Sequence, residues 1–214
     1  GISMAQTAEG AMDEVTGMLQ RIRTLAQQSA NGTNSDDDRT ALQKEVNQLS
    51  EEIDRISTNT TFAGTKLLNT DDATFNFQVG ADANQTIGLT LDSVKIDDLA
   101  TTATATNFAS GKDGIDITTA EKAQLVLGDV DKMLQVVDGK RAELGAVQNR
   151  LDSTIRNQSN ISENVSAARS RIRDADFATE TANMTKQNIL QQAASSILAQ
   201  ANQRPQSALS LLGR

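Results

Sequence analysis

The chain has 214 residues, and its 28 Asp and Glu residues outnumber 20 Lys and Arg residues to give a formal net charge of −8. His, Cys, Trp and Tyr are absent from the sequence, which removes the commonest general base, the thiol nucleophile and the commonest zinc ligands. The acidic balance argues against nucleic-acid binding, no apolar run approaches the ~20 residues of a membrane span, and no carboxylate pair stands out. We therefore expect neither an enzyme nor a cofactor, and neither a nucleic-acid nor a membrane partner.

The first predicted helix runs from about residue 3 to residue 30. Its apolar residues step by four and three, as Ala8, Met12, Val15, Leu19, Ile22 and Ala26. This spacing is typical of a coiled-coil a/d seam, although a plain amphipathic core helix gives the same pattern over so short a length. We expect the helix to end at Asn31-Gly32, because glycine readily takes the left-handed C-cap conformation.

The second predicted helix covers about residues 36–58 and forms a hairpin with the first. The same seam spacing recurs in Leu42, Val46, Leu49, Ile53 and Ile56. Either Ser35 or Asp36 caps this helix, and Asp36, Asp37 and Asp38 then lie at its positive end, where carboxylates are favoured. A metal site is the alternative, but adjacent carboxylates lack the spacing of a calcium loop.

Residues 71–118 are predicted to form a β-hairpin and irregular chain. Apolar and polar residues alternate in "ATFNFQVG" and in "TIGLTLDSVKI", and the turn-rich "GADANQ" joins them. The segment "TTATATNFASGKDGIDITT" is small, polar and weakly patterned, which indicates irregular structure.

A long third helix follows from about residue 119 to residue 172, capped by Thr118 or Thr119. Its seam contains Leu134, Val137, Leu144, Leu151, Ile155, Val165, Ala168 and Ile172. Polar residues interrupt this seam and weaken the core locally: Arg141, Gln148, Gln158 and Ser162. The sequence thus predicts a mainly α fold, an elongated coiled-coil-like bundle over residues 1–172 with a small β-hairpin region.

The remaining segment, residues 173–214, is predicted to be a C-terminal helical tail. No charged side chain occurs from Gln187 to Gln203, which indicates a helix that is buried against other helices rather than exposed to solvent. The apolar residues of the tail are Ile189, Leu190, Ile197, Leu198, Leu209, Leu211 and Leu212. A frayed C-terminus is the simpler alternative.

Several long blocks of this sequence resemble bacterial flagellin. They are "GISMAQTAEGAMDEVTGMLQRIRTLAQQSANGTNS", "LQKEVNQLSEEIDRISTNTTFAGTKLL", "FQVGADANQTI" and "SENVSAARSRIRDADFATETANMTKQNILQQAASSILAQANQRPQSALSLLGR". The resemblance implies a structural filament subunit, exported unfolded by the flagellar type III apparatus and polymerised beneath a cap outside the cell. It also implies an inner layer of paired terminal helices and a rod-like helical layer with a β-hairpin.

The sequence departs from the family pattern in two ways. The usual N-terminal block is missing, so we expect this chain to lack the N-terminal inner-layer helix. The middle is short, so we expect no large outer domain. Without its partners the tail should be disordered in the free subunit, and the resemblance implies that the export chaperone holds this same segment.

The resemblance also assigns a partner-binding surface to one helix face. Gln20, Arg21, Arg23, Leu25 and Glu45 match the flagellin surface that stacks protofilaments and that the flagellin-sensing Toll-like receptor of vertebrates binds. Many receptor-active members carry Glu where this chain has Thr24. From the residues alone, Arg21 and Leu25 are neighbours at i, i+4, and we expect both on one exposed face. The alternative is that Leu25 is core and that the arginines are solvated and pair with nearby acids.

Overall fold

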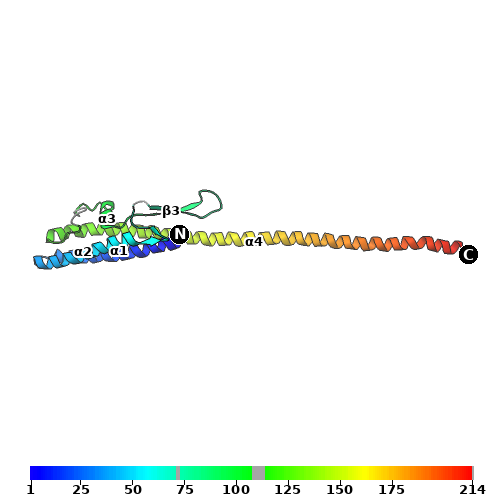
Figure 1. The fold of residues 1–214 in the computed structure, drawn as a ribbon, viewed down its shortest axis with the longest axis horizontal. Helices are drawn as coiled ribbons and strands as arrows, with labels where there is room; N and C mark the ends of the chain where they lie inside the picture. The colour runs from blue at the N-terminus through cyan, green and yellow to red at the C-terminus, as the bar shows by residue number, and fades with distance from the viewer. Residues whose placement is uncertain (71–72, 108–113, 214) are drawn as a thin grey trace. The chain divides into compact units, whose positions relative to one another are not determined.

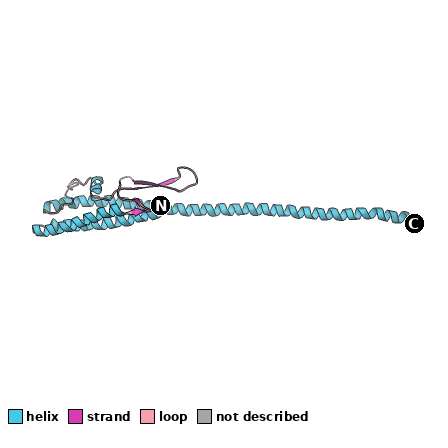
Figure 2. Ribbon diagram, in the orientation of Figure 1, coloured by secondary structure: helices cyan, strands magenta, loops and turns pink. Residues whose placement is uncertain are grey.

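The computed structural model describes residues 1–70, 73–107 and 114–213, and these divide into two compact units, Gly1–Ile155 and Arg156–Arg214. Figures 1 and 2 show mostly helix with a few short strands. The elements in chain order are α1 (Ile2–Ser29), α2 (Asp36–Asn59), β1 (Thr61–Phe62), β2 (Thr65–Lys66), β3 (Ala73–Gln78), β4 (Thr86–Leu91), α3 (Ile96–Thr102) and α4 (Ala120–Leu212). A mainly α fold with a small antiparallel hairpin is confirmed.

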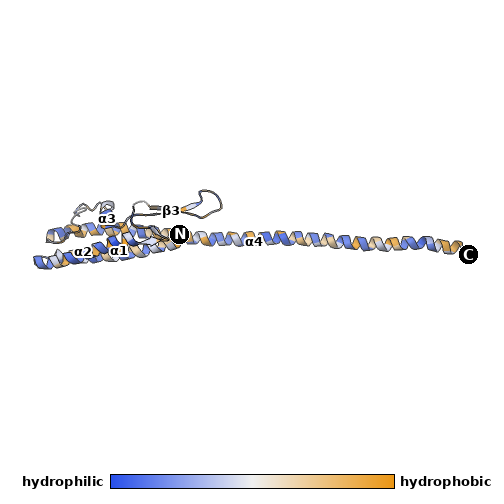
Figure 3. Ribbon diagram, viewed as in Figure 1, coloured by the Kyte–Doolittle hydropathy of each residue, from blue (hydrophilic) through white to orange (hydrophobic). Residues whose placement is uncertain are grey.

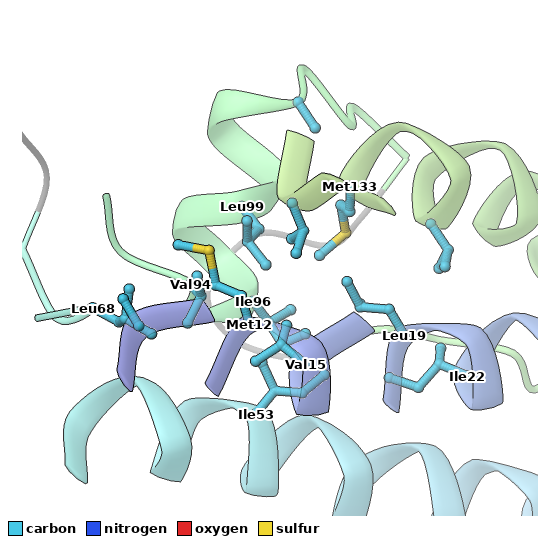
Figure 4. Close-up of a cluster of buried hydrophobic side chains, with 14 of the residues drawn as sticks. Met12, Val15, Leu19, Ile22, Ile53, Leu68, Val94, Ile96, Leu99 and Met133 are labelled. Atoms are coloured by element: carbon cyan, nitrogen blue, oxygen red, sulfur yellow. The ribbon is translucent and has the colours of Figure 1, made fainter. Parts of the chain in front are cut away.

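α1 and α2 form a helical hairpin in the first unit. All six predicted seam residues of α1 are buried, and Val46 and Ile53 of α2 are fully buried against them. Figure 4 shows side chains of α1, among them Met12 and Leu19, lying between Ile53 on one side and Met133 of α4 on the other. α1 is therefore covered by α2 and α4, and buried residues of β4, α3 and the loops beside them complete the core.

The first helix ends near the predicted position, but the predicted glycine C-cap is wrong. α1 ends at Ser29 with Ala30 in right-handed geometry at the C-cap, and Gly32 does not take a positive φ. The buried side chain of Arg39, from the first turn of α2, donates from Nε to Ser29 O at 3.0 Å and from Nη2 to Asn31 O at 3.2 Å. A cation thus satisfies the carbonyls at the end of α1, which makes a glycine C-cap unnecessary.

The start of α2 is a capping box, with Ser35 as the N-cap. Ser35 Oγ accepts from Asp38 N at 3.1 Å, and Asp38 Oδ2 accepts from Ser35 N at 2.9 Å. The hydrogen bond from the Ser35 backbone holds the pKa of Asp38 below its ordinary value. Helix-start chemistry therefore accounts for the run of three aspartates.

The β-hairpin pairs as the alternation predicts. β3 and β4 are antiparallel, with Phe75 opposite Leu89 and Phe77 opposite Ile87. The second strand is shorter than predicted, because it ends at Leu91 and Ile96 already begins α3. Two elements were not predicted: α3 itself and the β1–β2 hairpin, whose turn residues Ala63 and Gly64 have φ of 50° and 81°. The segment predicted to be irregular falls partly on residues 108–113, outside the described residues.

The helix α4 begins with Thr119 as its cap, since Thr119 Oγ1 accepts from Lys122 N at 3.1 Å. Within the first unit, Val137, Leu144 and Leu151 are buried as the seam predicts. The helix does not end at residue 172 but continues to Leu212, and the expected burial of the later seam is wrong, because Val165 and Ile172 are 60% and 64% exposed. No helix among the described residues is long and apolar enough to cross a membrane.

Candidate assembly surfaces

Arg21 lies on α1 and reaches across to α2. Its Nε contacts Glu45 Oε1 at 2.8 Å, and the two side chains are 51% and 42% exposed. A pair this exposed contributes about 0–1 kcal/mol to stability. Within the described residues the contact uses one guanidinium nitrogen, so the rest of the fork faces solvent and can meet a partner.

Arg23 points to a different neighbour. Its Nε contacts Asp131 Oδ1 of α4 at 2.7 Å. Residues two apart on a helix do not share a face. Arg21 therefore forms its ion pair with α2, whereas Arg23 forms its ion pair with α4. Asp131 was not predicted as a partner, because nothing in the local sequence distinguishes it from other acidic residues of that helix.

The expected exposure of Leu25 is wrong. Its side chain is 1% exposed and belongs to the core, whereas Gln20, Arg21 and Thr24 around it are exposed. The reason is geometric: α1 packs against α2 on one side and α4 on the other, so its buried stripe is wider than a two-residue seam. Any partner-binding face here consists of Gln20, Arg21 and Glu45, with Leu25 beneath it.

Two of the four polar residues that interrupt the α4 seam, Arg141 and Gln148, contact carboxylates of α1. Arg141 Nη2 lies 3.0 Å from Asp13 Oδ1, and Gln148 Nε2 donates to Glu9 Oε2 at 3.2 Å. Directional contacts of this kind fix the register of two helices more than they stabilise them. The prediction that these positions interrupt the apolar seam is consistent with this arrangement.

The second unit presents a very different surface. Every predicted apolar residue of the tail is more than half exposed, from 52% for Leu190 to 82% for Leu212. Figure 3 shows apolar and polar residues alternating along this part of α4. Large apolar side chains are normally buried in a folded protein, and a long exposed series of them marks an interaction surface.

Neither unit offers an evident reaction centre among the residues that the structure describes. No group of three or more acidic side chains there is placed to hold a metal ion. The surfaces that stand out are a helical face with open guanidinium donors and a neutral apolar helix. Together they define a helical structural protein whose surfaces serve association.

The chain belongs to the bacterial flagellin family. The family model for the bacterial flagellin N-terminal helical region matches residues 1–73, and the model for the C-terminal helical region matches residues 127–212. Since an N-terminal match is present, the expectation that this chain lacks the N-terminal inner-layer helix is not confirmed. Flagellins are structural subunits of the flagellar filament outside the cell and are not enzymes.

Individual relatives agree with this assignment. A flagellin of Halalkalibacterium halodurans is 47% identical over 212 residues, covering 99% of this chain and 75% of the relative. Flagellin D of Vibrio anguillarum is 37% identical, covering 100% of this chain and 81% of the relative. The crystal structure of Bacillus cereus flagellin is similar with a TM-score of 0.59 and 29% identity, over 73% of this chain and 84% of that one.

Proposed function

We propose that this chain builds the flagellar filament by burying its neutral tail against neighbouring subunits, with the first unit as the rod-like layer. The single observation that supports this most strongly is the exposure of the apolar tail residues in the isolated chain: Ile189, Leu190, Ile197, Leu198, Leu209, Leu211 and Leu212 are 52–82% exposed. Burying one such side chain contributes about 1.5–3 kcal/mol. Seven of them in one helix supply a large driving force for association.

The absence of charge from residue 187 to residue 203 supports the same role. An ion taken out of water without a partner costs several kcal/mol, whereas amides and small side chains pack without that penalty. The tail is therefore suited to a crowded helical interior. We further propose that in the free subunit the tail is disordered and that the flagellar export chaperone binds it before export through the type III apparatus and assembly beneath the filament cap.

The tail proposal is tested by placing polar groups on the apolar positions. The double variant Leu190→Ser/Ile197→Ser should lose self-association, measured by sedimentation and negative-stain electron microscopy, while the first unit keeps its melting temperature. Gln192→Ser is the matched control, because it changes a residue of the same segment without removing apolar surface. Assembly of the double variant at the parental concentration would show that these side chains are not the contact.

We also propose that Gln20, Arg21 and Glu45 form a contact between subunits that the flagellin-sensing Toll-like receptor recognises as well, while Arg23 stays paired with Asp131 on another side of α1. Support comes from the exposed Arg21–Glu45 pair and from its open guanidinium nitrogens, since planar forks give geometric specificity to interfaces. Leu25 takes part only by holding α1 in place beneath the surface.

A receptor-binding assay tests this second surface. Arg21→Ala should weaken binding of the receptor ectodomain by about tenfold or more, as truncation of an interface hot spot does. Arg55→Ala is the control, because Arg55 forms an equally exposed pair with Glu52 elsewhere on α2. Thr24→Glu should strengthen binding. Parental binding by Arg21→Ala would exclude the surface.

A further inference from the structure

One face of α4 in the second unit combines arginines with an aromatic ring. Ser166, Arg169, Ser170, Arg173, Asp174 and Phe177 line a single shallow hollow of the helix surface. Their spacing of three and one residues places them on one side of the helix, with about 6 Å between successive positions four residues apart. Phe177 is 76% exposed.

Within the described residues, the two arginines of this face, Arg169 and Arg173, have no partner, and neither does Arg171 on another side of the helix. Among the residues that the structure describes, the guanidiniums of Arg169, Arg171 and Arg173 form no hydrogen bond or ion pair, although Asp174 and Asp176 are close in sequence. The first unit treats its arginines differently. Five of its six arginines contact a carboxylate, namely Arg21, Arg23, Arg39, Arg55 and Arg141, and Arg150 is the exception within the described ranges.

The two units also differ in net charge. Residues 156–214 contain seven Lys and Arg against four Asp and Glu, a net charge of +3. Residues 1–155 contain 13 Lys and Arg against 24 Asp and Glu, a net charge of −11. A second copy of this chain therefore carries a surface of the opposite sign to the arginine face, and opposite potentials steer and orient association.

We propose that the face formed by Arg169, Arg173 and Phe177 binds the acidic first unit of a second copy of this chain. The arginines contact carboxylates there in a forked geometry, and Phe177 is buried between them and the partner. Arg and aromatic residues are the types that dominate binding energy in interfaces. The inference rests on the proposed role as a filament subunit and adds to it a contact between unlike units of two copies, separate from the apolar tail.

Nucleic acid is the other polyanion that arginines could bind. The net charge of the whole chain, −8, disfavours it, because nonspecific nucleic-acid binding is driven by release of counterions to clustered basic charge. Packing of one tail against another would bring like-charged arginines together. An acidic helical surface of a second copy is thus the occupant that the charges favour.

The first experiment places a photoreactive benzoyl group at the ring of Phe177 in the full chain. Copies labelled with ¹⁵N are mixed with unlabelled copies, assembled at low ionic strength and irradiated, and crosslinks between copies are mapped by mass spectrometry. We expect crosslinks to acidic peptides within residues 1–155, at several times the yield of the same probe at Thr179, on the opposite side of the helix. Crosslinks confined to residues 156–214, or equal yields from both positions, would overturn the inference.

The second experiment separates a specific contact from a general charge effect. Arg169→Gln/Arg173→Gln should raise the concentration needed for half-maximal self-association by roughly tenfold or more. Arg171→Gln removes the same charge two residues away on another side of the helix, and should change that concentration by less than about twofold. Equal effects of Arg171→Gln and of either single variant, Arg169→Gln or Arg173→Gln, would overturn the inference. If the parental chain does not associate at all, the proposed function itself fails, whereas assembly without these effects removes only this contact.

Discussion

Replacing Ile53 by Ala should destabilise the first unit more than any change on the exposed side of α2. Ile53 is 0% exposed and packs against α1 within the core (Figure 4). The change removes three carbon atoms, a transfer loss of about 2.4 kcal/mol at ~0.8 kcal/mol for each. The cavity left behind adds to this, and Ile→Ala substitutions in cores cost about 2–5 kcal/mol. For a unit of this size, a loss of about 3–4 kcal/mol lowers Tm by roughly 6–16 °C.

Scanning calorimetry is a suitable assay, since the chain contains no Trp or Tyr for intrinsic fluorescence. Gln48→Ala is the control on the same helix. Its side chain is exposed, so we expect a change within about 0.5 kcal/mol. Equal melting temperatures for Ile53→Ala and Gln48→Ala would show that the packing of α2 against α1 has been assigned wrongly.

Three further predictions concern polar contacts and the arginine surface. Arg39→Met should cost about 1–3 kcal/mol in urea unfolding, because it removes the side-chain donor to the buried carbonyl of Ser29 at the end of α1. Arg55→Met, at an exposed pair, should cost less than about 1 kcal/mol, and equal costs would contradict the capping role. Partial burial raises the pKa of Asp116, but hydrogen bonds to it outweigh this and hold the pKa below its ordinary value. The ionised Asp116 should therefore stabilise the folded state above pH ~4, and this stabilisation should be lost as the pH falls through the folded-state pKa. The parent should melt at a higher temperature than Asp116→Asn near neutral pH but not in acid. A higher melting temperature of the parent that persisted at low pH would contradict this. Leu25→Ala should lower Tm and Arg21→Ala should leave it nearly unchanged, as circular dichroism can check; the reverse order would place Leu25 outside the core.

The helices of the first unit could be predicted because their apolar spacing is set by the packing itself. The steps of four and three from Ala8 to Ala26 follow one side of a helix, and that side is buried. Leu25 could not be placed by the same pattern. A seam of two positions per heptad is what a helix needs to pack against one other helix. Because α1 packs against both α2 and α4, residues that flank the seam are buried as well.

Short elements and contacts between residues far apart in the chain could not be predicted from the sequence pattern. α3 has seven residues and buries Ile96 and Leu99, too few positions to establish a period. The end of α1 depends on Arg39, ten residues beyond Ser29, so local C-cap rules pointed to Gly32 instead. Asp129 is another such case: it is fully buried in α4 and accepts two hydrogen bonds from Asn107, a contact that only the tertiary fold defines.

The tail was recognisable because its composition departs from that of a solvated helix. No charged residue occurs from Gln187 to Gln203, and apolar residues such as Leu190 and Ile197 lie one heptad apart there. A helix of this composition is expected to pack against other helices rather than to face water. In the isolated chain these side chains are exposed, so the burial of the tail stays a prediction, and its partners do not follow from its own sequence. They lie in other chains, where no periodicity within this one can identify them.

Backbone hydrogen exchange across residues 187–203, compared between the dilute chain and its assembled polymer, can show whether the tail packs between subunits. The measurement reports whether the tail gains a buried environment on assembly. If the tail is the packing element of the filament, its amides should exchange rapidly in the dilute chain and become protected by at least about 100-fold in the polymer, while amides of the α1 core change little. Tail amides that exchange as fast in the polymer as in the dilute chain would show that the tail is not the packing element of the filament.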